Sequence, residues 1–152
     1  MAFWDALKQN LGNMSSNVQG QVAKFKNADF ANASMALCAM IAAADGSIDA
    51  TERQKTAGFI KSNPVLSVFD AVQLKEKFDY YCGRLEADYD FGKIEAIQAV
   101  GKLRSKPDQA RALIQVGVII GAADGNFDAQ EKAALREACQ AVGIPPQEFD
   151  LV

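Results

Sequence analysis

The sequence contains no histidine, and this absence restricts the chemistry that the chain can perform. Histidine is the commonest general base in enzymes and the commonest side-chain ligand of transition metals. The three cysteines, Cys38, Cys82 and Cys139, are far apart and form no C-x-x-C pair, which zinc and iron–sulfur sites usually need. Their odd number and wide spacing predict reduced, unpaired thiols that pack as small apolar side chains.

Long apolar stretches are also missing. The longest nearly apolar stretch, Met35 to Ala44, is much shorter than the about 20 residues that cross a bilayer. The first residues lack the basic start and apolar run of a signal peptide. A net charge of −3 gives no reason to expect a nucleic-acid partner. We therefore expect a cytoplasmic protein that has no direct membrane span.

The apolar residues that are present recur at helical spacing. They make up 49% of the 152 residues, which is enough to fill one core. No segment alternates apolar and polar residues as a strand does. We predict an all-α fold, an irregular bundle of about seven helices, and expect Phe91, Ile94, Ile97 and Val100 of one helix to face inward. After the N-terminal helix, the others are predicted over about 34–44, 49–62, from 70, 90–103, 107–123 and 128–142.

The first 28 residues are predicted to form an amphipathic helix that can move relative to the helical domain of residues 29–152. An apolar stripe marks one face of this helix: Trp4, Leu7, Leu11, Met14, Val18, Val22 and Phe25. The stripe either packs on the domain's own core or binds a partner protein or a membrane surface. Because weak helix formers carry it, we expect Ala2 to Phe25 to contribute least to stability and most to association.

One acidic pattern, A-A-D-G-x-[IF]-D-A-x-E-[RK], occurs twice, over residues 43–53 and 122–132. Both copies follow an apolar helix, which indicates an internal duplication and a pseudo-twofold repeat of a helix–turn–helix motif. Within each copy the second aspartate can cap the next helix, and the glutamate three residues later can complete a capping box. These pairs are Asp49 with Glu52 and Asp128 with Glu131.

The first aspartate of each copy, Asp45 or Asp124, needs another explanation. It follows the C-terminal end of a helix, where a carboxylate is disfavoured by about 0.3–1 kcal/mol. Its position implies a compensating positive charge, either a basic side chain or a bound cation. A regular EF-hand is excluded, because Ile41 and Ala43 would stand at the first two side-chain ligand positions of the loop.

A metal site would therefore combine ligands from both copies of the motif. We expect Asp45, Glu52, Asp124 and Glu131 to converge on one shared acidic site. Asp49 and Asp128 are expected beside it or occupied as caps. Because all these ligands are oxygens, the cation would be Ca²⁺ or Mg²⁺. Carboxylates held this close repel one another, so at least one pKa should be raised in the absence of metal.

The sequence resembles the TerB tellurite-resistance family over essentially its whole length. The resemblance rests on the two motifs, the Asn63-Pro64 stop, the stretch from Tyr80 to Asp90 and the closing Gly143-Ile144-Pro145. It implies a seven-helix cytoplasmic protein of a bacterial tellurium-resistance operon, a family also associated with phage inhibition and colicin resistance. The implied partners are other tellurium-resistance proteins, including an integral inner-membrane protein, which would place the chain peripherally at that membrane. The metal site that the resemblance implies maps onto Asp45, Asp49, Glu52, Asp124, Asp128 and Glu131.

Two functions are consistent with these features. The first is a stress-response module that binds a divalent metal through the paired motifs. The second is a metal-independent protein-interaction scaffold that uses the same acidic surface. An enzyme is disfavoured, because helical di-metal enzymes commonly use an E-x-x-H motif and thiol chemistry needs reactive, ideally paired cysteines.

Overall fold

The computed structural model describes residues 13–123 and 127–151, and this part of the chain is all-helical. A helical segment over residues 13–22 comes first. The six helices that follow are α2 (Ala28–Ala42), α3 (Ala50–Ser62), α4 (Ala71–Ala87), α5 (Tyr89–Gly101), α6 (Pro107–Gly121) and α7 (Ala129–Val142). Two short 3₁₀ helices, η1 (Pro64–Leu66) and η2 (Pro146–Phe149), follow α3 and α7.

This architecture confirms the predicted all-α class with about seven helices, and the described residues contain no strand. The pseudo-twofold relation between the two motif-bearing halves stays a prediction. None of the described helices combines the length and the apolar content needed to cross a bilayer.

Polar side chains fix the starts of most helices close to where the sequence predicts them. The side chain just before each of five helices accepts a hydrogen bond from a backbone N–H of the first turn: Asn27, Asp49, Asp70, Asp88 and Asp128. The exception, α6, has Pro107 in its first turn instead, where no N–H is needed. At the other end of α7, Gly143 adopts a φ of 73°, a left-handed conformation that suits glycine.

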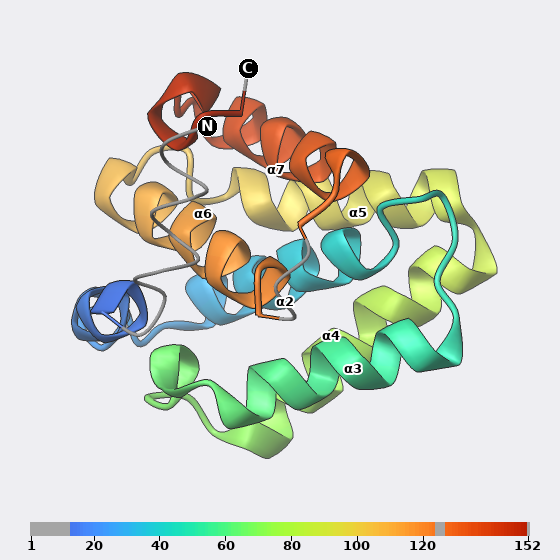
Figure 1. Cartoon of the computed structure of the whole chain (residues 1–152), viewed down its shortest axis with the longest axis horizontal. Coiled ribbons are helices and arrows are strands. Elements are labelled where there is room, and N and C mark those ends of the chain that lie inside the picture. Colours follow the sequence, from blue (N-terminus) through green and yellow to red (C-terminus); the bar gives the residue numbers. More distant parts are fainter. Residues whose placement is uncertain (1–12, 124–126, 152) are drawn as a thin grey trace.

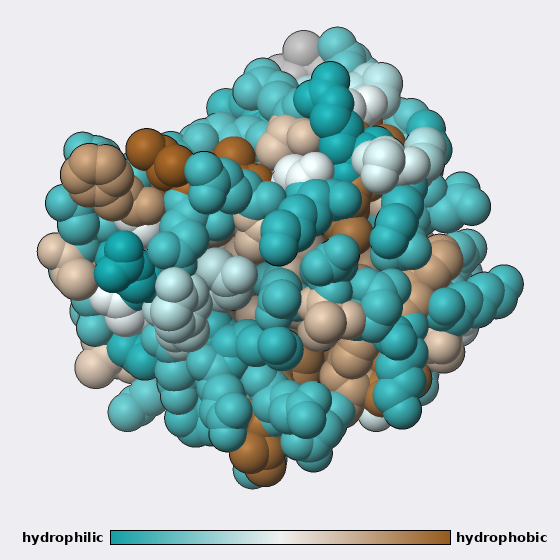
Figure 2. Space-filling model, turned by 180° about the vertical axis from the view of Figure 1, so that it is seen from behind, coloured by the Kyte–Doolittle hydropathy of each residue, from teal (hydrophilic) through white to brown (hydrophobic). Residues whose placement is uncertain are grey.

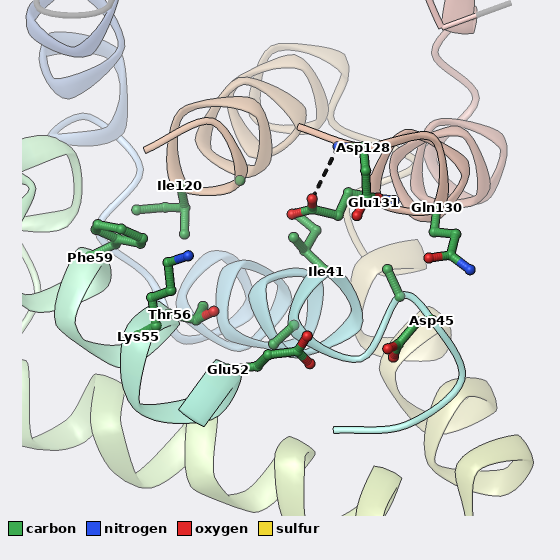
Figure 3. Close-up of a pocket in the computed structure, with 13 residues that line it drawn as sticks. Ile41, Asp45, Glu52, Lys55, Thr56, Phe59, Ile120, Asp128, Gln130 and Glu131 are labelled. Atoms are coloured by element: carbon green, nitrogen blue, oxygen red, sulfur yellow. Dashed lines mark hydrogen bonds between the residues drawn. The ribbon is translucent and has the colours of Figure 1, made fainter. Parts of the chain in front are cut away.

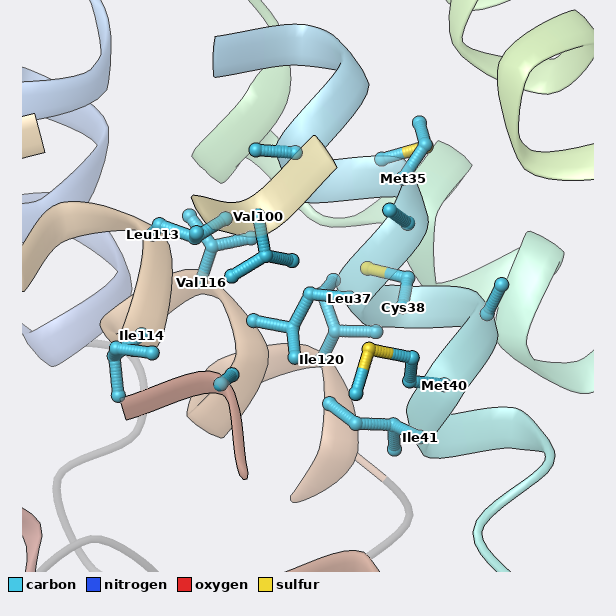
Figure 4. Close-up of a cluster of buried hydrophobic side chains, with 14 of the residues drawn as sticks. Met35, Leu37, Cys38, Met40, Ile41, Val100, Leu113, Ile114, Val116 and Ile120 are labelled. Atoms are coloured by element: carbon cyan, nitrogen blue, oxygen red, sulfur yellow. The ribbon is translucent and has the colours of Figure 1, made fainter. Parts of the chain in front are cut away.

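The core is built around α2, which passes through the middle of the molecule (Figure 1). This helix is apolar on all sides, as expected of a fully buried helix, and it contacts α4, α5, α6 and α7. Figure 4 shows Leu37, Met40 and Ile41 of α2 beside Val116 and Ile120 of α6. The close approach of α6 depends on a glycine, because a Cβ at Gly117 would lie 2.7 Å from Cδ2 of Leu37.

The described part of the N-terminal apolar stripe belongs to this core. Val18 and Val22 are 2% and 0% exposed, and Met14 and Phe25 pack against the same cluster while partly buried. This packing favours the alternative in which the stripe covers the domain's own core. The first three members of the stripe lie outside the described residues: Trp4, Leu7 and Leu11.

The expectation that Phe91 and Ile94 face inward is wrong, since they are 67% and 53% exposed. Instead α5 turns its small residues inward, and Gly92 allows close packing on α4. A Cβ at Gly92 would lie only 2.7 Å from backbone atoms of Arg84 and Leu85. Figure 2 shows apolar surface at the upper left, the side on which α5 meets α4. Phe91 and Ile94 are therefore displaced outward, whereas Val100 is buried and Ile97 packs against the core while partly buried, as predicted.

The helix α3 is only lightly packed, with Ile60 as its one buried residue. An ion-pair network instead connects its N-terminal half to α4. The Arg53 guanidinium lies 3.2 Å from Oδ1 of Asp79 and 3.1 Å from Oε1 of Glu86. Ala57 and Phe59 of α3 pack against the core while partly buried, and the helix also borders two cavities.

Candidate functional site

The two motif copies border a single cavity of about 240 Å³ (Figure 3). Asp45 and Glu52 line it from the first copy, and Asp128 and Glu131 line it from the second. The walls are the end of α2, one face of α3, the end of α6 and the start of α7. Three of the four residues expected to converge, Asp45, Glu52 and Glu131, thus border one cavity, together with Asp128, which was expected beside them or as a cap. A shared metal site stays a prediction.

The other two predicted ligands are not part of the described cavity wall. Asp49 does not line it, because its carboxylate caps α3 and accepts a hydrogen bond of 2.7 Å from the Glu52 N–H. Asp124 lies outside the described residues.

Asp45 reaches the cavity from the turn that follows α2. The turn contains Gly46 at a φ of 93°, a conformation that residues with side chains rarely adopt. Oδ1 of Asp45 accepts a hydrogen bond of 3.2 Å from the N–H of Ser47. This Asx turn gives the Asp45 carboxylate a local structural role that was not predicted. An aspartate next to a glycine in a turn is a usual sequence signal of such a hydrogen bond.

The capping arrangement differs between the two copies, and the difference affects the cavity. In the second copy the box is complete: Asp128 accepts from the Glu131 N–H at 2.8 Å, and Glu131 accepts from the Asp128 N–H at 3.1 Å. In the first copy Asp49 caps α3 in the same way, but no return bond from Glu52 is found among the described residues. The carboxylate of Glu52 extends into the cavity instead (Figure 3).

Glu52 lies in a partly buried and acidic environment. Burial raises the pKa of Glu52, and the negative charges of Asp45, Asp49 and Asp128 raise it further, while Lys55 opposes the shift. The contribution of Asp128 crosses from one motif to the other. The repulsion between carboxylates that the sequence predicted therefore contributes to this shift, after burial.

Several residues of the cavity wall were not anticipated from the sequence. Lys55, Thr56 and Phe59 follow Glu52 at helical spacing on α3, so they share its face. The ammonium of Lys55 points into the cavity in Figure 3. Helical periodicity from Glu52 would have predicted that all three share its face, but they lie beyond the end of the motif at Arg53.

The described residues do not by themselves form a preformed metal site. Their carboxylate oxygens suit Ca²⁺ or Mg²⁺ in kind. However, no three acidic or thiol side chains of residues 13–123 and 127–151 lie close enough together to hold an ion. Asp128 and Glu131 also use oxygens in the capping box. Ligation would require Glu131 to leave that box or Asp124 to contribute from the neighbouring loop.

The three cysteines have no features of a reactive site. All are buried and free, which confirms the prediction of unpaired thiols. Burial raises the pKa of Cys38, Cys82 and Cys139 to about 12 each. Because the thiolate is the nucleophile, these thiols are poorly suited to attack an oxyanion such as tellurite.

Comparison with known proteins identifies relatives over most of the chain. The family described as "Tellurite resistance protein TerB" matches residues 31–152, which include α3 to α7 and both acidic motifs. The Tellurium resistance protein TerB of Alcaligenes sp is 31% identical over 118 residues, which are 78% of this chain and 97% of that protein. No solved structure matches the chain significantly.

Proposed function

The chain belongs to the TerB family of tellurite-resistance proteins, and from this membership we propose a stress-response module that binds a divalent cation between its two acidic motifs. The cation would be Ca²⁺ or Mg²⁺, and the module would act by binding rather than by catalysis. The family membership supports the role in tellurite resistance. The cavity between the motifs supports the binding of a positive charge.

The observation that carries this proposal is the cavity that Asp45 and Glu52 of one motif line together with Asp128 and Glu131 of the other. Burial and the charges of Asp45, Asp49 and Asp128 disfavour ionisation of the Glu52 carboxyl group there and raise its pKa. A cation placed among these groups would remove the repulsion and stabilise the ionised form. Ligands would come from Asp45 and Glu52 on one side and from Asp128, Glu131 and Asp124 on the other.

Thermal unfolding of the purified chain tests cation binding. A ligand that binds only the folded state stabilises it by about 2.7 kcal/mol at a hundredfold excess over its Kd. We expect Ca²⁺ or Mg²⁺ to raise the Tm of the wild type and of a control, Glu76→Gln, whose exposed side chain lies away from the cavity. Glu52→Gln should lose this response. A Tm indifferent to millimolar Ca²⁺, Mg²⁺ and Mn²⁺ would rule the proposal out.

A second candidate is a metal-independent scaffold that uses the same acidic surface to bind a basic segment of a partner protein. Two observations favour it: no three acidic side chains of the described residues are grouped for a metal, and Lys55 already brings a positive charge to the cavity. Binding to a partner that persists in a chelator but is weakened by salt and by Glu52→Gln would favour this scaffold.

In either case we propose that the partners are other tellurium-resistance proteins, including an integral inner-membrane protein. The chain would then act in the cytoplasm, peripherally at the inner membrane. Family membership supports this placement, and co-purification with membranes of cells that express the other resistance proteins would test it. We expect to recover the chain with those membranes only when the membrane partner is present.

A further inference from the structure

A second cavity, of about 550 Å³, lies on the opposite face of α3 from the acidic cavity. On α3, Glu52, Thr56 and Phe59 border the acidic cavity. Gly58 and Lys61, on the other side of the same helix, border the second one. The segment containing η1 and the first half of α4 complete its walls. Its volume is within the range of sites for small molecules, about 300–1,000 Å³.

The inner part of this cavity is apolar. Ile60, Leu66, Leu74 and Phe78 form its floor, and each of these side chains is buried in the domain core. Toward the opening, Val72 also lines the cavity while remaining 64% exposed. A floor of this kind favours a ligand with an apolar part, because binding would remove further apolar surface from water.

The charged residues of the cavity have one sign. Lys61 and Lys75 line it, and no aspartate or glutamate does, although acidic residues outnumber basic ones in the chain by 19 to 16. Lys75 also pairs with Asp79 outside the cavity, whereas no ion pair of Lys61 is found in the described part of the chain. The first turn of α4, with Ala71 in the wall, is already capped by Asp70, whose carboxylate accepts a hydrogen bond of 3.2 Å from the N–H of Gln73, so the positive charge at the cavity comes from the lysines.

We propose that this cavity binds a small amphiphile, an apolar chain that ends in a carboxylate. The chain would lie against the four buried floor residues, and the carboxylate would lie at the opening, near Lys61. The ligand class is thus opposite in charge to the one proposed for the acidic cavity, so the two sites can be tested separately.

Decanoate is a suitable probe, with decyltrimethylammonium as a probe of equal chain length and opposite charge. Binding is measured by isothermal titration calorimetry, and the site is mapped by amide chemical shifts of the full-length protein. We expect saturable binding of decanoate, with the largest shifts in α3, η1 and the start of α4. Ala71→Trp should block the opening and weaken binding at least about tenfold. Lys61→Glu should weaken it roughly three- to tenfold, because it replaces an attractive contact by a repulsive one.

The control for charge is Lys102→Glu, which makes the same change at an exposed position just after α5 that does not line the cavity and should leave binding unchanged. Absence of saturable binding, or shifts located away from α3 and α4, would overturn the proposal. Equal binding of the two probes with no effect of Lys61→Glu would overturn the anionic ligand class. Binding to phosphatidylglycerol vesicles but not to free decanoate would also overturn the proposal, because the surface would then bind a membrane and not a free amphiphile. If Ala71→Trp fails to fold, the amide shifts of the wild type and the decanoate affinity of Lys61→Glu still test the proposal.

Discussion

Glu52 on α3 and Asp128 at the start of α7 lie on opposite sides of one cavity, and the charge of Asp128 contributes to the raised pKa of Glu52. The two residues belong to different copies of the duplicated motif. After burial and the charges of Asp45 and Asp49, the charge of Asp128 thus acts on Glu52 from the other copy of the motif.

The raised pKa of Glu52 predicts a specific pH dependence of stability in the absence of divalent cations. A folded-state pKa above the ordinary value of 4.5 means that the folded protein holds this proton more tightly than the unfolded chain. The stabilising contribution is therefore complete below about pH 4.5 and is lost as pH rises through the folded-state pKa. Urea unfolding in a chelator should find Glu52→Gln equal to wild type near pH 4 and more stable near pH 7. The difference should be about 1 kcal/mol or less, because the side chain is partly solvated.

The cap residue Asp49 should affect folding rather than binding. Asp49→Ala removes the acceptor for the Glu52 N–H and should cost about 0.5–2 kcal/mol of unfolding free energy. Asp49→Asn is the matched control, since asparagine caps as well as aspartate does. Urea unfolding curves measure the loss, and thermal shifts with Ca²⁺ or Mg²⁺ measure the retained response. A cation response lost in both variants, with stability unchanged, would instead make Asp49 a ligand.

Two helical glycines should respond in opposite directions to the same substitution. A Cβ at Gly83 of α4 would meet no atom within 4 Å, so Gly83→Ala should stabilise the protein by about 0.5–1 kcal/mol. At Gly92 the new Cβ would meet backbone atoms of α4 at 2.7 Å, and Gly92→Ala should destabilise by about 1–3 kcal/mol. Thermal and urea unfolding measure both changes. A stabilised Gly92→Ala would mean that α5 and α4 are not in close contact there.

The thiols should be almost inert in the folded protein. Burial raises the pKa of each to about 12, so the thiolate fraction near pH 8 is very small. A colorimetric thiol reagent should therefore react slowly with the native chain and rapidly with all three cysteines after unfolding in guanidinium. Rapid native reaction of any one thiol would contradict its burial. Mass spectrometry of protein kept from air should also find no disulfide.

The sequence alone determined the helical class, the starts of most helices and the existence of two related motifs, although α2 begins at Ala28 and not near Ser34 as predicted. These features depend on interactions between residues three or four positions apart, such as Asp49 with Glu52 and Asp128 with Glu131. It also identified four of the charged residues that line the shared cavity, because the repetition of a motif can be read without coordinates.

Only the tertiary structure decided which faces of the helices are buried and which carboxylates interact. In α5 the small side chain of Gly92 sets the contact with α4, so Phe91 and Ile94 face solvent although their spacing predicted burial. In the cavity Glu131 is held in its capping box while Glu52 is not, a difference that two nearly identical motifs do not reveal. The cavity with Lys61 arises because α3 is lightly packed between its neighbours. Such features depend on the distances between elements that are far apart in the chain. The periodicity and spacing of residues in the sequence do not predict these distances.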